Sequence, residues 1–241
     1  MIAIAYLRST LYYVLLIASV LLYAPIMFAT APFGYDWHWR AAYGWLWLHQ
    51  QLVRHVCGLK VEVHGREHLP SEPAVLLIKH QSMLETLTTQ LIFPRQTWVL
   101  KQELLRVPLF GWALAMLKPV HIDRGSAAQA LKSVLRQGAA RLQEGLWLVI
   151  FPEGTRVLPG QTGNWAKGGA LLAKRAGAPV VPVAHNAGTF WLRRRLLIRP
   201  GVWQLHIGPP IPTGGASVEA VNEQARGWIE ARMAELEGRR T

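Results

Sequence analysis

The sequence predicts an α/β fold in which a central mixed sheet is flanked by helices and preceded by an N-terminal membrane-associated helical pair. Residues 1–57 combine a long uncharged apolar stretch with a second stretch rich in aromatic and basic side chains. From about Leu59 onward, short apolar runs typical of buried strands alternate with helical patterns, which favours an α/β domain. A chain of 241 residues suits one well-cored domain with a small appendage. We therefore predict a division into residues 1–57 and residues 58–241.

The first helix of the pair is expected to lie in lipid. No charged side chain occurs between Arg8 and Asp36, and Leu11–Phe28 is almost wholly apolar. Such a stretch approaches the roughly 20 residues that a helix needs to cross a bilayer. Arg8 and the A-x-A-like residues 29–31 also imitate a cleavable secretory signal. The apolar core exceeds the usual length of about 7–15 residues for such a signal, so we expect a retained membrane helix.

The second helix of the pair is expected over Trp37–Val56, where tryptophan, tyrosine and leucine are mixed with arginine and histidine. Aromatic side chains beside cations are typical of a helix at the boundary between lipid headgroups and water. The pair either spans the membrane once or dips into it and returns, and the sequence leaves both possibilities open.

The second part of the chain is predicted to contain seven strands and several helices. The predicted strands are Val61–His64, Ala74–Ile78, Trp98–Leu100, Val120–Ile122, Leu146–Phe151, Val180–Ala184 and Trp203–Ile207. Apolar residues at spacings of three and four predict helices at 126–145, with Ser126 as N-cap, and at 165–177 and 218–236.

Charge and cysteine content narrow the function classes. The net charge is +12, from 26 Lys and Arg against 14 Asp and Glu. Such a balance suits an anionic membrane surface, an anionic substrate or nucleic acid. The single cysteine, Cys57, excludes an intrachain disulfide and a multi-cysteine zinc site, which fits a reducing compartment.

A histidine and a carboxylate follow one predicted strand in the sequence HQSMLETL, residues 80–87. If Ser82 caps a helix, His80 lies in the preceding turn and Glu85 is the third helical residue. Two side chains five residues apart on one helix point about 140° away from each other, so the pair can meet only if His80 precedes the helix. Ser82-x-x-Glu85 is also a capping box, in which Glu85 binds back to the N-cap amide. One carboxylate accepts enough hydrogen bonds for both roles.

A second polar turn follows another predicted strand, in the sequence WLVIFPEGTR at residues 147–156. Open α/β sheets bind their ligands at the carboxyl ends of their strands, which is where this turn falls. Arg156 offers a planar fork of donors suited to phosphate, which the close-approaching backbone of Gly154 and the hydroxyl of Thr155 can supplement. The alternative is a solvated turn arginine that pairs with Glu153.

Together the two turns, about seventy residues apart, resemble motifs of the 1-acylglycerol-3-phosphate acyltransferase family of glycerolipid synthesis. The block KQELLRVPLFGWALAMLKPVHIDR at 101–124 is similar to the family's second motif in its K-x-E-L, P-x-F-G-W and I-D-R pieces, and APVVPVAHNAG at 178–188 looks like its fourth. The matches run in order over roughly residues 61–208. One position departs from the family pattern, because Glu85 stands where the family usually has the shorter aspartate.

The resemblance implies transfer of a fatty acyl chain from acyl-CoA or acyl-carrier protein to the sn-2 hydroxyl of lysophosphatidic acid, which gives phosphatidic acid. A secondary alcohol must lose its proton as it attacks, and a neutral histidine is the side chain best matched to accept it. His80 is therefore the expected general base, and Glu85 is expected to fix the tautomer of its imidazole. No covalent acyl-enzyme is needed, and Cys57 is assigned no catalytic role.

The resemblance also implies a set of substrate-binding residues. They are Lys101, Arg124, Glu153, Gly154, Thr155 and Arg156. Arg124 and Arg156 match the family's phosphate-binding arginines, and Lys101 is a further candidate for that role. The other three are expected to shape the glycerol end of the site.

The expected partners are lysophosphatidic acid, the acyl donor and anionic membrane lipids, with no nucleic acid, cofactor or metal. We expect the protein at the inner or plasma membrane, with a glycerolipid acyltransferase domain at residues 58–241 on the cytoplasmic side. Another acceptor, such as glycerol 3-phosphate or another lysophospholipid, remains an alternative. A basic membrane-tethered binding module would explain the charge but not the two turns that bear carboxylates. A metal-dependent hydrolase is disfavoured, because the remaining histidines show no ligand spacing.

Overall fold

The computed structural model describes residues 2–123, 125–193 and 195–238. Within these ranges, seven strands form one sheet: β1 (Leu59–His64), β2 (Val75–Ile78), β3 (Gln96–Lys101), β4 (Val120–Ile122), β5 (Trp147–Ile150), β6 (Val180–His185) and β7 (Gly201–Ile207). The strand order is β1-β7-β6-β2-β5-β3-β4. Of the neighbouring strand pairs in the described part of the chain, β6 and β7 are antiparallel and the other pairs are parallel. The predicted mixed sheet is confirmed, and each predicted strand is present with its ends shifted by no more than one or two residues.

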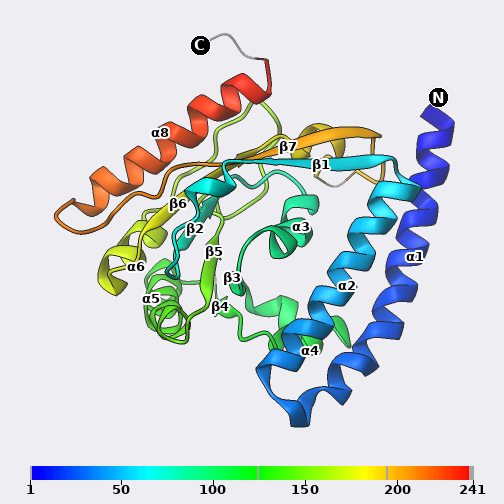
Figure 1. The fold of residues 1–241 in the computed structure, drawn as a ribbon, viewed down its shortest axis with the longest axis horizontal. Helices are drawn as coiled ribbons and strands as arrows, with labels where there is room; N and C mark the ends of the chain where they lie inside the picture. Colours follow the sequence, from blue (N-terminus) through cyan, green and yellow to red (C-terminus); the bar gives the residue numbers. More distant parts are fainter. Residues whose placement is uncertain (1, 124, 194, 239–241) are drawn as a thin grey trace.

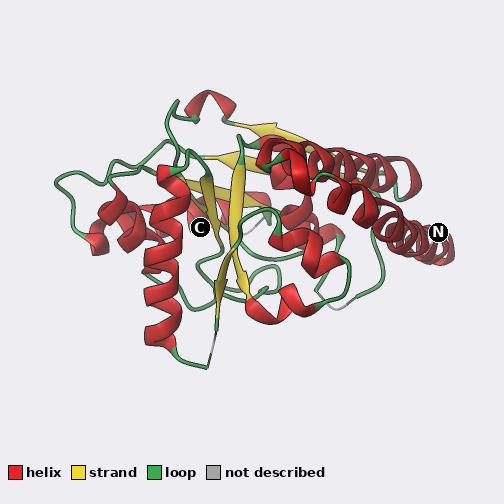
Figure 2. Cartoon of the chain, turned by 90° about the horizontal axis from the view of Figure 1, so that it is seen from below, coloured by secondary structure: helices red, strands yellow, loops and turns green. Residues whose placement is uncertain are grey.

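The helices cover both faces of this sheet. The α-helices are α1 (Ile2–Ala29), α2 (Tyr35–Val56), α3 (Leu84–Ile92), α4 (Phe110–Ala115), α5 (Ala127–Gln143), α6 (Gly168–Ala176), α7 (Ala187–Phe190) and α8 (Val218–Leu236). Short 3₁₀ turns occur at η1 (Ala31–Phe33), η2 (Arg66–His68) and η3 (Gln102–Arg106). Helices α5, α6 and α8 lie on one side of the strands and α1, α2 and α3 on the other (Figure 1). Figure 2 shows the same strands from below, with helices on either side.

The alternation of side chains along the central strands produces two buried clusters. In β2, Leu76 and Ile78 join the cluster that includes α1, α2 and α3, while Val75 and Leu77 join the cluster with α5, α6 and α8. Successive side chains of a strand point to opposite faces of the sheet. A strand that is buried on both faces is therefore apolar throughout, as β2 is.

The connections that leave β2 and β5 run in opposite directions. From β2 the chain passes through α3 to β3 on one side, and from β5 it passes through α6 to β6 on the other. Right-handed crossovers of opposite direction place α3 and α6 on opposite faces of the sheet, as the two clusters show. The carboxyl ends of β2 and β5 thus form a topological switch point, where open α/β sheets bind ligands.

The predicted N-terminal helical pair is present as α1 and α2, which lie against each other (Figure 1). Among the described residues, α1 is the helix long and apolar enough to cross a membrane, with a mean hydropathy of 2.1. One side of α1 exposes large apolar side chains such as Leu7, Leu11 and Leu22, while Tyr12 on its other side is fully buried. The proposed division at residue 57 stays a prediction. Buried side chains of α1 and α2 share one cluster with the sheet.

Two helix starts differ from the sequence-based expectation. Helix α3 begins at Leu84, so Met83 rather than Ser82 is its N-cap residue. The hydroxyl of Ser82 still accepts from the backbone N–H of Leu84 at 3.2 Å, and the backbone N–H of Ser82 donates to the carboxylate of Glu85. Helix α6 begins at Gly168 rather than near residue 165. Before that start, the backbone N–H of Ala166 bonds to the carbonyl of Pro152. Ser126 caps α5 as predicted, and its hydroxyl accepts from the N–H of Gln129.

Candidate active site

The turns after β2 and β5 lie side by side, because these strands are parallel neighbours in the sheet. Two hydrogen bonds join them at His80. The backbone N–H of His80 donates to Oε2 of Glu153 at 2.8 Å, and the backbone N–H of Val157 donates to the carbonyl of His80 at 2.9 Å. The backbone of His80 is therefore held on both sides by the turn that carries Arg156.

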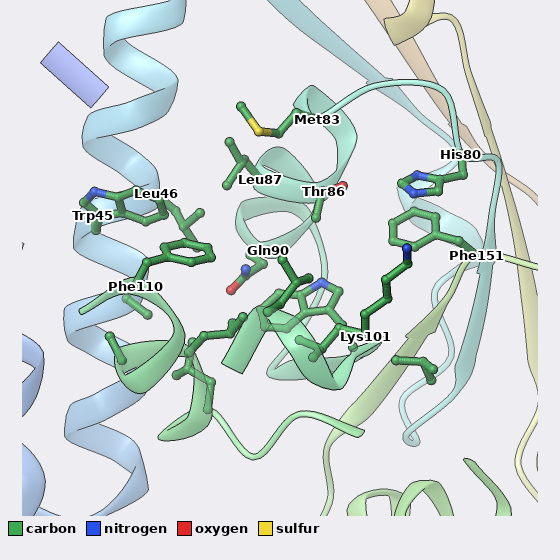
Figure 3. A pocket seen from close by; sticks show the side chains of 18 of the residues that line it. Trp45, Leu46, His80, Met83, Thr86, Leu87, Gln90, Lys101, Phe110 and Phe151 are labelled. Atoms are coloured by element: carbon green, nitrogen blue, oxygen red, sulfur yellow. The ribbon is translucent and has the colours of Figure 1, made fainter. Parts of the chain in front are cut away.

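The side chains of His80 and Glu85 meet as the sequence predicted. Nδ1 of His80 lies 2.9 Å from Oε1 of Glu85, and His80 precedes the first residue of α3. A carboxylate only accepts hydrogen bonds, so Nδ1 carries a proton, and in the neutral ring Nε2 then keeps a lone pair. The ring of His80 also stacks on Phe151, with centroids 4.0 Å apart (Figure 3). The imidazole is thus fixed in both tautomer and orientation.

Glu85 is built to remain ionised despite its burial. Its side chain has no exposed surface, whereas that of His80 is 14% exposed. Besides His80, the carboxylate accepts from the backbone N–H groups of Gln81 at 3.1 Å and Ser82 at 2.9 Å. Burial acts to raise the pKa of Glu85, but nearby His185, His80 and the backbone N–H of Ser82 outweigh it and lower that pKa. Glu85 therefore takes both roles that the sequence suggested for it: its carboxylate binds His80, and it also accepts from backbone N–H groups before the helix.

Glu153 faces inward, toward the His80 turn. Its Oε1 forms an ion pair with Nζ of Lys79, and both side chains are almost completely buried. Its Oε2 accepts from the backbone N–H of His80. Burial, the largest influence, raises the pKa of Glu153, and Lys79 and His80 counteract this only partly. The alternative in which Glu153 pairs with Arg156 is wrong, because the carboxylate is occupied by Lys79 and His80.

Arg156 lines the cavity, and one of its hydrogen-bond donors has no partner among the described residues. Its Nε is buried, and no described residue accepts a hydrogen bond from it. Its backbone carbonyl accepts from Nη1 of Arg193 at 2.8 Å, which brings a second guanidinium beside it. Gly154 adopts a left-handed conformation, with φ of +64°, in the tight turn before Thr155. Arg156 and Arg193 therefore supply positive charge next to His80.

A cavity of about 590 Å³ extends from these groups toward the N-terminal helices. His80, Thr155 and Arg156 line its polar end, and most of the remaining wall is apolar. The apolar lining includes residues of α1 (Val20, Tyr23, Ala24 and Met27), α2 (Ala42, Trp45 and Leu46), α3 and its N-cap (Leu87 and Met83), α4 (Phe110, Ala113 and Leu114) and the strands β3 (Trp98) and β5 (Ile150). A volume of this size suits a small-molecule site.

Lys101, another predicted site residue, projects into this cavity from the end of β3. Figure 3 shows its amino group directed toward His80 and Phe151. The structure thus brings His80, Glu85, Lys101 and residues 153–156 to one place. Arg124 lies outside the described residues.

Two features bear on the other chemistries considered. Cys57 is buried at the end of α2, and burial raises the pKa of its thiol to about 11, which is the wrong direction for a nucleophile. Among the described residues, no group of three or more His, Cys, Asp or Glu side chains could hold a metal ion.

The sequence analysis did not identify three residues of this site. Lys79 pairs with Glu153, His185 donates from Nε2 to the carbonyl of Lys79 at 2.6 Å, and Arg193 lines the cavity. Lys79 and His185 carried a weak signal, since each is a polar residue at the end of a buried strand. Arg193 belongs to a run of arginines that equally suits a solvated surface, so its pattern did not distinguish the two environments.

Comparison with known proteins agrees with this geometry. An acyltransferase family model matches residues 60–186. The chain is 42% identical over 237 residues to the 1-acyl-sn-glycerol-3-phosphate acyltransferase of Pseudomonas aeruginosa, which covers 95% of this chain and 91% of that protein. This chain belongs to the 1-acylglycerol-3-phosphate acyltransferase family. The family and the enzyme class predicted from the two motifs are thereby confirmed.

More distant relatives extend the comparison. The 1-acyl-sn-glycerol-3-phosphate acyltransferase alpha of Homo sapiens is 30% identical over 172 residues, or 70% of this chain and 61% of that protein. The crystal structure of the 1-acyl-sn-glycerophosphate (LPA) acyltransferase of Thermotoga maritima matches with a TM-score of 0.81, over 98% of this chain and 97% of that one. At 20% identity, this second match shows a common fold, including the helical pair in front of the sheet.

Proposed function

We propose that this acyltransferase moves a fatty acyl chain from an acyl thioester to the sn-2 hydroxyl of lysophosphatidic acid, with His80 as the general base. The observation that supports this most directly is the pairing of His80 with the buried carboxylate of Glu85, beside Arg156, at one end of a largely apolar cavity. The relatives named above supply the acceptor, because their names describe acyltransferases of 1-acylglycerol 3-phosphate.

The proton transfers follow from the hydrogen bonds of His80. Nε2 of His80 takes the proton of the attacking hydroxyl while the hydroxyl oxygen bonds to the thioester carbonyl carbon. Glu85 stabilises the imidazolium that forms, as the carboxylate does in a catalytic triad. The carbon–sulfur bond then breaks, and the departing thiolate takes the proton back from the imidazolium. The acyl chain passes directly from sulfur to oxygen.

The cationic groups at the polar end would bind the acceptor's phosphate. Nε of Arg156 is buried and donates to no described residue, and an arginine fork matches phosphate oxygens in a bidentate geometry. Lys101 and Arg124 are the further candidates from the motif. Gly154 and Thr155 directly precede Arg156 and line the same cavity as His80, where they would border the glycerol.

The apolar lining would hold the acyl chain, and the exposed face of α1 would rest in the membrane. Leu7, Leu11 and Leu22 of α1 are largely exposed, as is Trp47 of α2. Burial of such side chains in lipid is favourable, and tryptophan is enriched at membrane interfaces. A membrane position would place the site where lysophosphatidic acid is found. The cytoplasmic orientation and the choice between acyl-CoA and acyl-carrier protein belong to the proposal.

The test is an assay of the purified protein in liposomes with a labelled acyl thioester. The acceptors are lysophosphatidic acid, glycerol 3-phosphate and a zwitterionic lysophospholipid, and wild type is compared with His80→Ala. We expect labelled phosphatidic acid from wild type and a rate lower by about 10²–10⁴-fold for His80→Ala, the usual contribution of a general base. An unchanged rate for His80→Ala would reject the mechanism. Preference for glycerol 3-phosphate would reject the acceptor.

A further inference from the structure

Lys79, immediately before the general base, uses all of its polar groups in contacts that hold the site together. Its backbone N–H donates to the carbonyl of Val183 at 3.0 Å, and its carbonyl accepts from Nε2 of His185. Its ammonium binds the carboxylate of Glu153 and the carbonyl of Gln161, the latter at 3.1 Å. The backbone of Lys79 is therefore tied to β6, and its side chain is tied to the loop after β5.

The hydrogen bond from His185 of β6 to the carbonyl of Lys79 has a fixed direction, because His185 is held in one tautomer. Nδ1 of His185 accepts from the backbone N–H of Ala187 at 3.2 Å, so the ring proton lies on Nε2 and is donated to Lys79. His185 is completely buried, and burial lowers its pKa, which keeps the ring neutral. The carbonyl of Lys79 is thus a fixed point from which His80 extends.

The side chain of Lys79 also holds the loop after β5, which carries Arg156. Lys79 contacts this loop on both sides of Arg156, at Glu153 and at Gln161. Glu153 in turn accepts from the N–H of His80, and Val157 donates to the carbonyl of His80. The loop with the phosphate-binding candidate and the turn with the general base are consequently joined by the backbone hydrogen bonds of His80 and, beside them, by the ammonium of Lys79.

We propose that Lys79 is a positioning residue that sets the spacing between the imidazole of His80 and the guanidinium of Arg156. The inference rests on the proposed function, in which these two groups hold the hydroxyl and the phosphate of one acceptor. A displacement of reacting groups by about 1 Å can lower a rate by about 10²-fold, so the ion pair matters for catalysis beyond its effect on folding. Without Lys79, the buried carboxylate of Glu153 has no neutralising cation and its charged form is disfavoured.

The experiment compares Lys79→Met, Lys79→Arg and wild type in the liposome assay, with the exposed Lys60→Met as the matched control. We expect Lys79→Met to lower kcat by about 10–100-fold and to raise KM for lysophosphatidic acid, since both ends of the acceptor lose their alignment. Lys79→Arg keeps the cation and should recover most of the loss. Lys60→Met should match wild type.

The pH profile separates positioning from simple stabilisation. The ionisable groups that face Glu153 are Lys79 and His80. In Lys79→Met, Glu153 should ionise only at higher pH, so activity should rise toward alkaline pH further than in wild type. A purely structural role would lower the amount of folded enzyme without a change in KM or pH profile, and that result would overturn the proposal.

A second variant covers the case in which Lys79→Met does not fold. Lys79→Met combined with Glu153→Gln removes the buried charge from both partners and should fold, yet keep a low kcat. A wild-type kcat in that double variant would also overturn the proposal. His80→Ala is measured alongside to separate failure of the proposed mechanism from failure of the role of Lys79. Activity in His80→Ala would reject the mechanism. An inactive His80→Ala together with a fully active Lys79→Met would reject only the role of Lys79.

Discussion

The two ends of the cavity are held by different kinds of interaction. At the polar end, His80 and the turn that carries Arg156 are fixed by directional hydrogen bonds, several of them to buried carboxylates. At the other end, α1, α2 and α4 contribute apolar side chains that are held mainly by packing, although Nε1 of Trp45 also donates to the hydroxyl of Ser19. Directional bonds need particular residues at particular positions, whereas packing accepts many side chains of similar volume. Substitutions should therefore affect the chemical step at the polar end and substrate selection at the apolar end.

The largest effect at the polar end, after loss of His80 itself, is expected from Glu85→Ala. This change removes the acceptor that fixes Nδ1 of His80. It also removes the charge that the proposed mechanism assigns to stabilising the imidazolium. Loss of the corresponding carboxylate in a catalytic triad costs about 10⁴ in kcat, and we expect a loss of kcat of about 10³–10⁴-fold. The measurement is the steady-state rate at saturating substrates.

Two further variants bracket the result for Glu85. Glu62→Ala removes an exposed acid from β1 and should leave kcat unchanged. Glu85→Asp, which shortens the side chain by one methylene, should retain part of the activity because the backbone N–H groups of Gln81 and Ser82 still hold the carboxylate. A kcat for Glu85→Ala within a factor of two of wild type would contradict the assigned role.

The second effect at the polar end is expected in acceptor binding. Arg156→Ala removes the guanidinium proposed for the phosphate, and a hydrogen bond to a charged group contributes about 1.5–3 kcal/mol. We therefore expect kcat/KM for lysophosphatidic acid to fall by about 10–150-fold, with a much smaller change in KM for the acyl thioester. The comparison variant is Arg195→Ala, which removes an exposed arginine two positions after Arg193. Equal effects on both substrates would show that Arg156 shapes the site rather than binding the acceptor.

The sequence predicted the polar end well because its residues sit in short motifs with fixed spacing. His80 and Glu85 had to lie on opposite sides of a helix start, and buried strands before both turns placed them at one edge of the sheet. The inward orientation of Glu153 was not predictable. Its partner Lys79 comes from the neighbouring strand end, and no local pattern distinguishes an inward carboxylate from an exposed one.

The sequence did not predict the apolar end. The apolar residues that line the cavity come from several helices and from strands such as β3 and β5, and each one alone reads as an ordinary core or membrane residue. Helix α4 was not predicted, because six residues give too little periodicity to recognise. Which side of each helix faces the cavity depends on how the helices pack, and that is a property of the whole fold.

A smaller effect is expected from a substitution that fills the apolar end. Ala113 of α4 lines the cavity and is partly buried, so Ala113→Phe should shorten the space for the acyl chain. Each methylene that loses its place in the cavity costs about 0.8 kcal/mol, or about fourfold in kcat/KM. Rates with a series of acyl chain lengths should shift toward shorter chains.

The control for this substitution lies on the same helix. Ala115 is exposed and does not line the cavity, so Ala115→Phe should leave the chain-length profile as in wild type. An unchanged profile in Ala113→Phe would place the acyl chain elsewhere.

The smallest expected effect is on the free energy of unfolding at acid pH, and it depends on the ionisation of Glu85. The pKa of Glu85 is lowered in the folded protein, so folding favours its ionised form. Its contribution to stability is therefore present above its ordinary pKa of 4.5 and is lost as pH falls through the lower folded-state pKa. Wild type should lose more unfolding free energy than Glu85→Gln below about pH 4.5, by at most about 1.4 kcal/mol per pH unit. Urea unfolding followed by tryptophan fluorescence measures this difference, and parallel pH dependences of the two proteins would show that the carboxylate is not preferentially ionised in the fold.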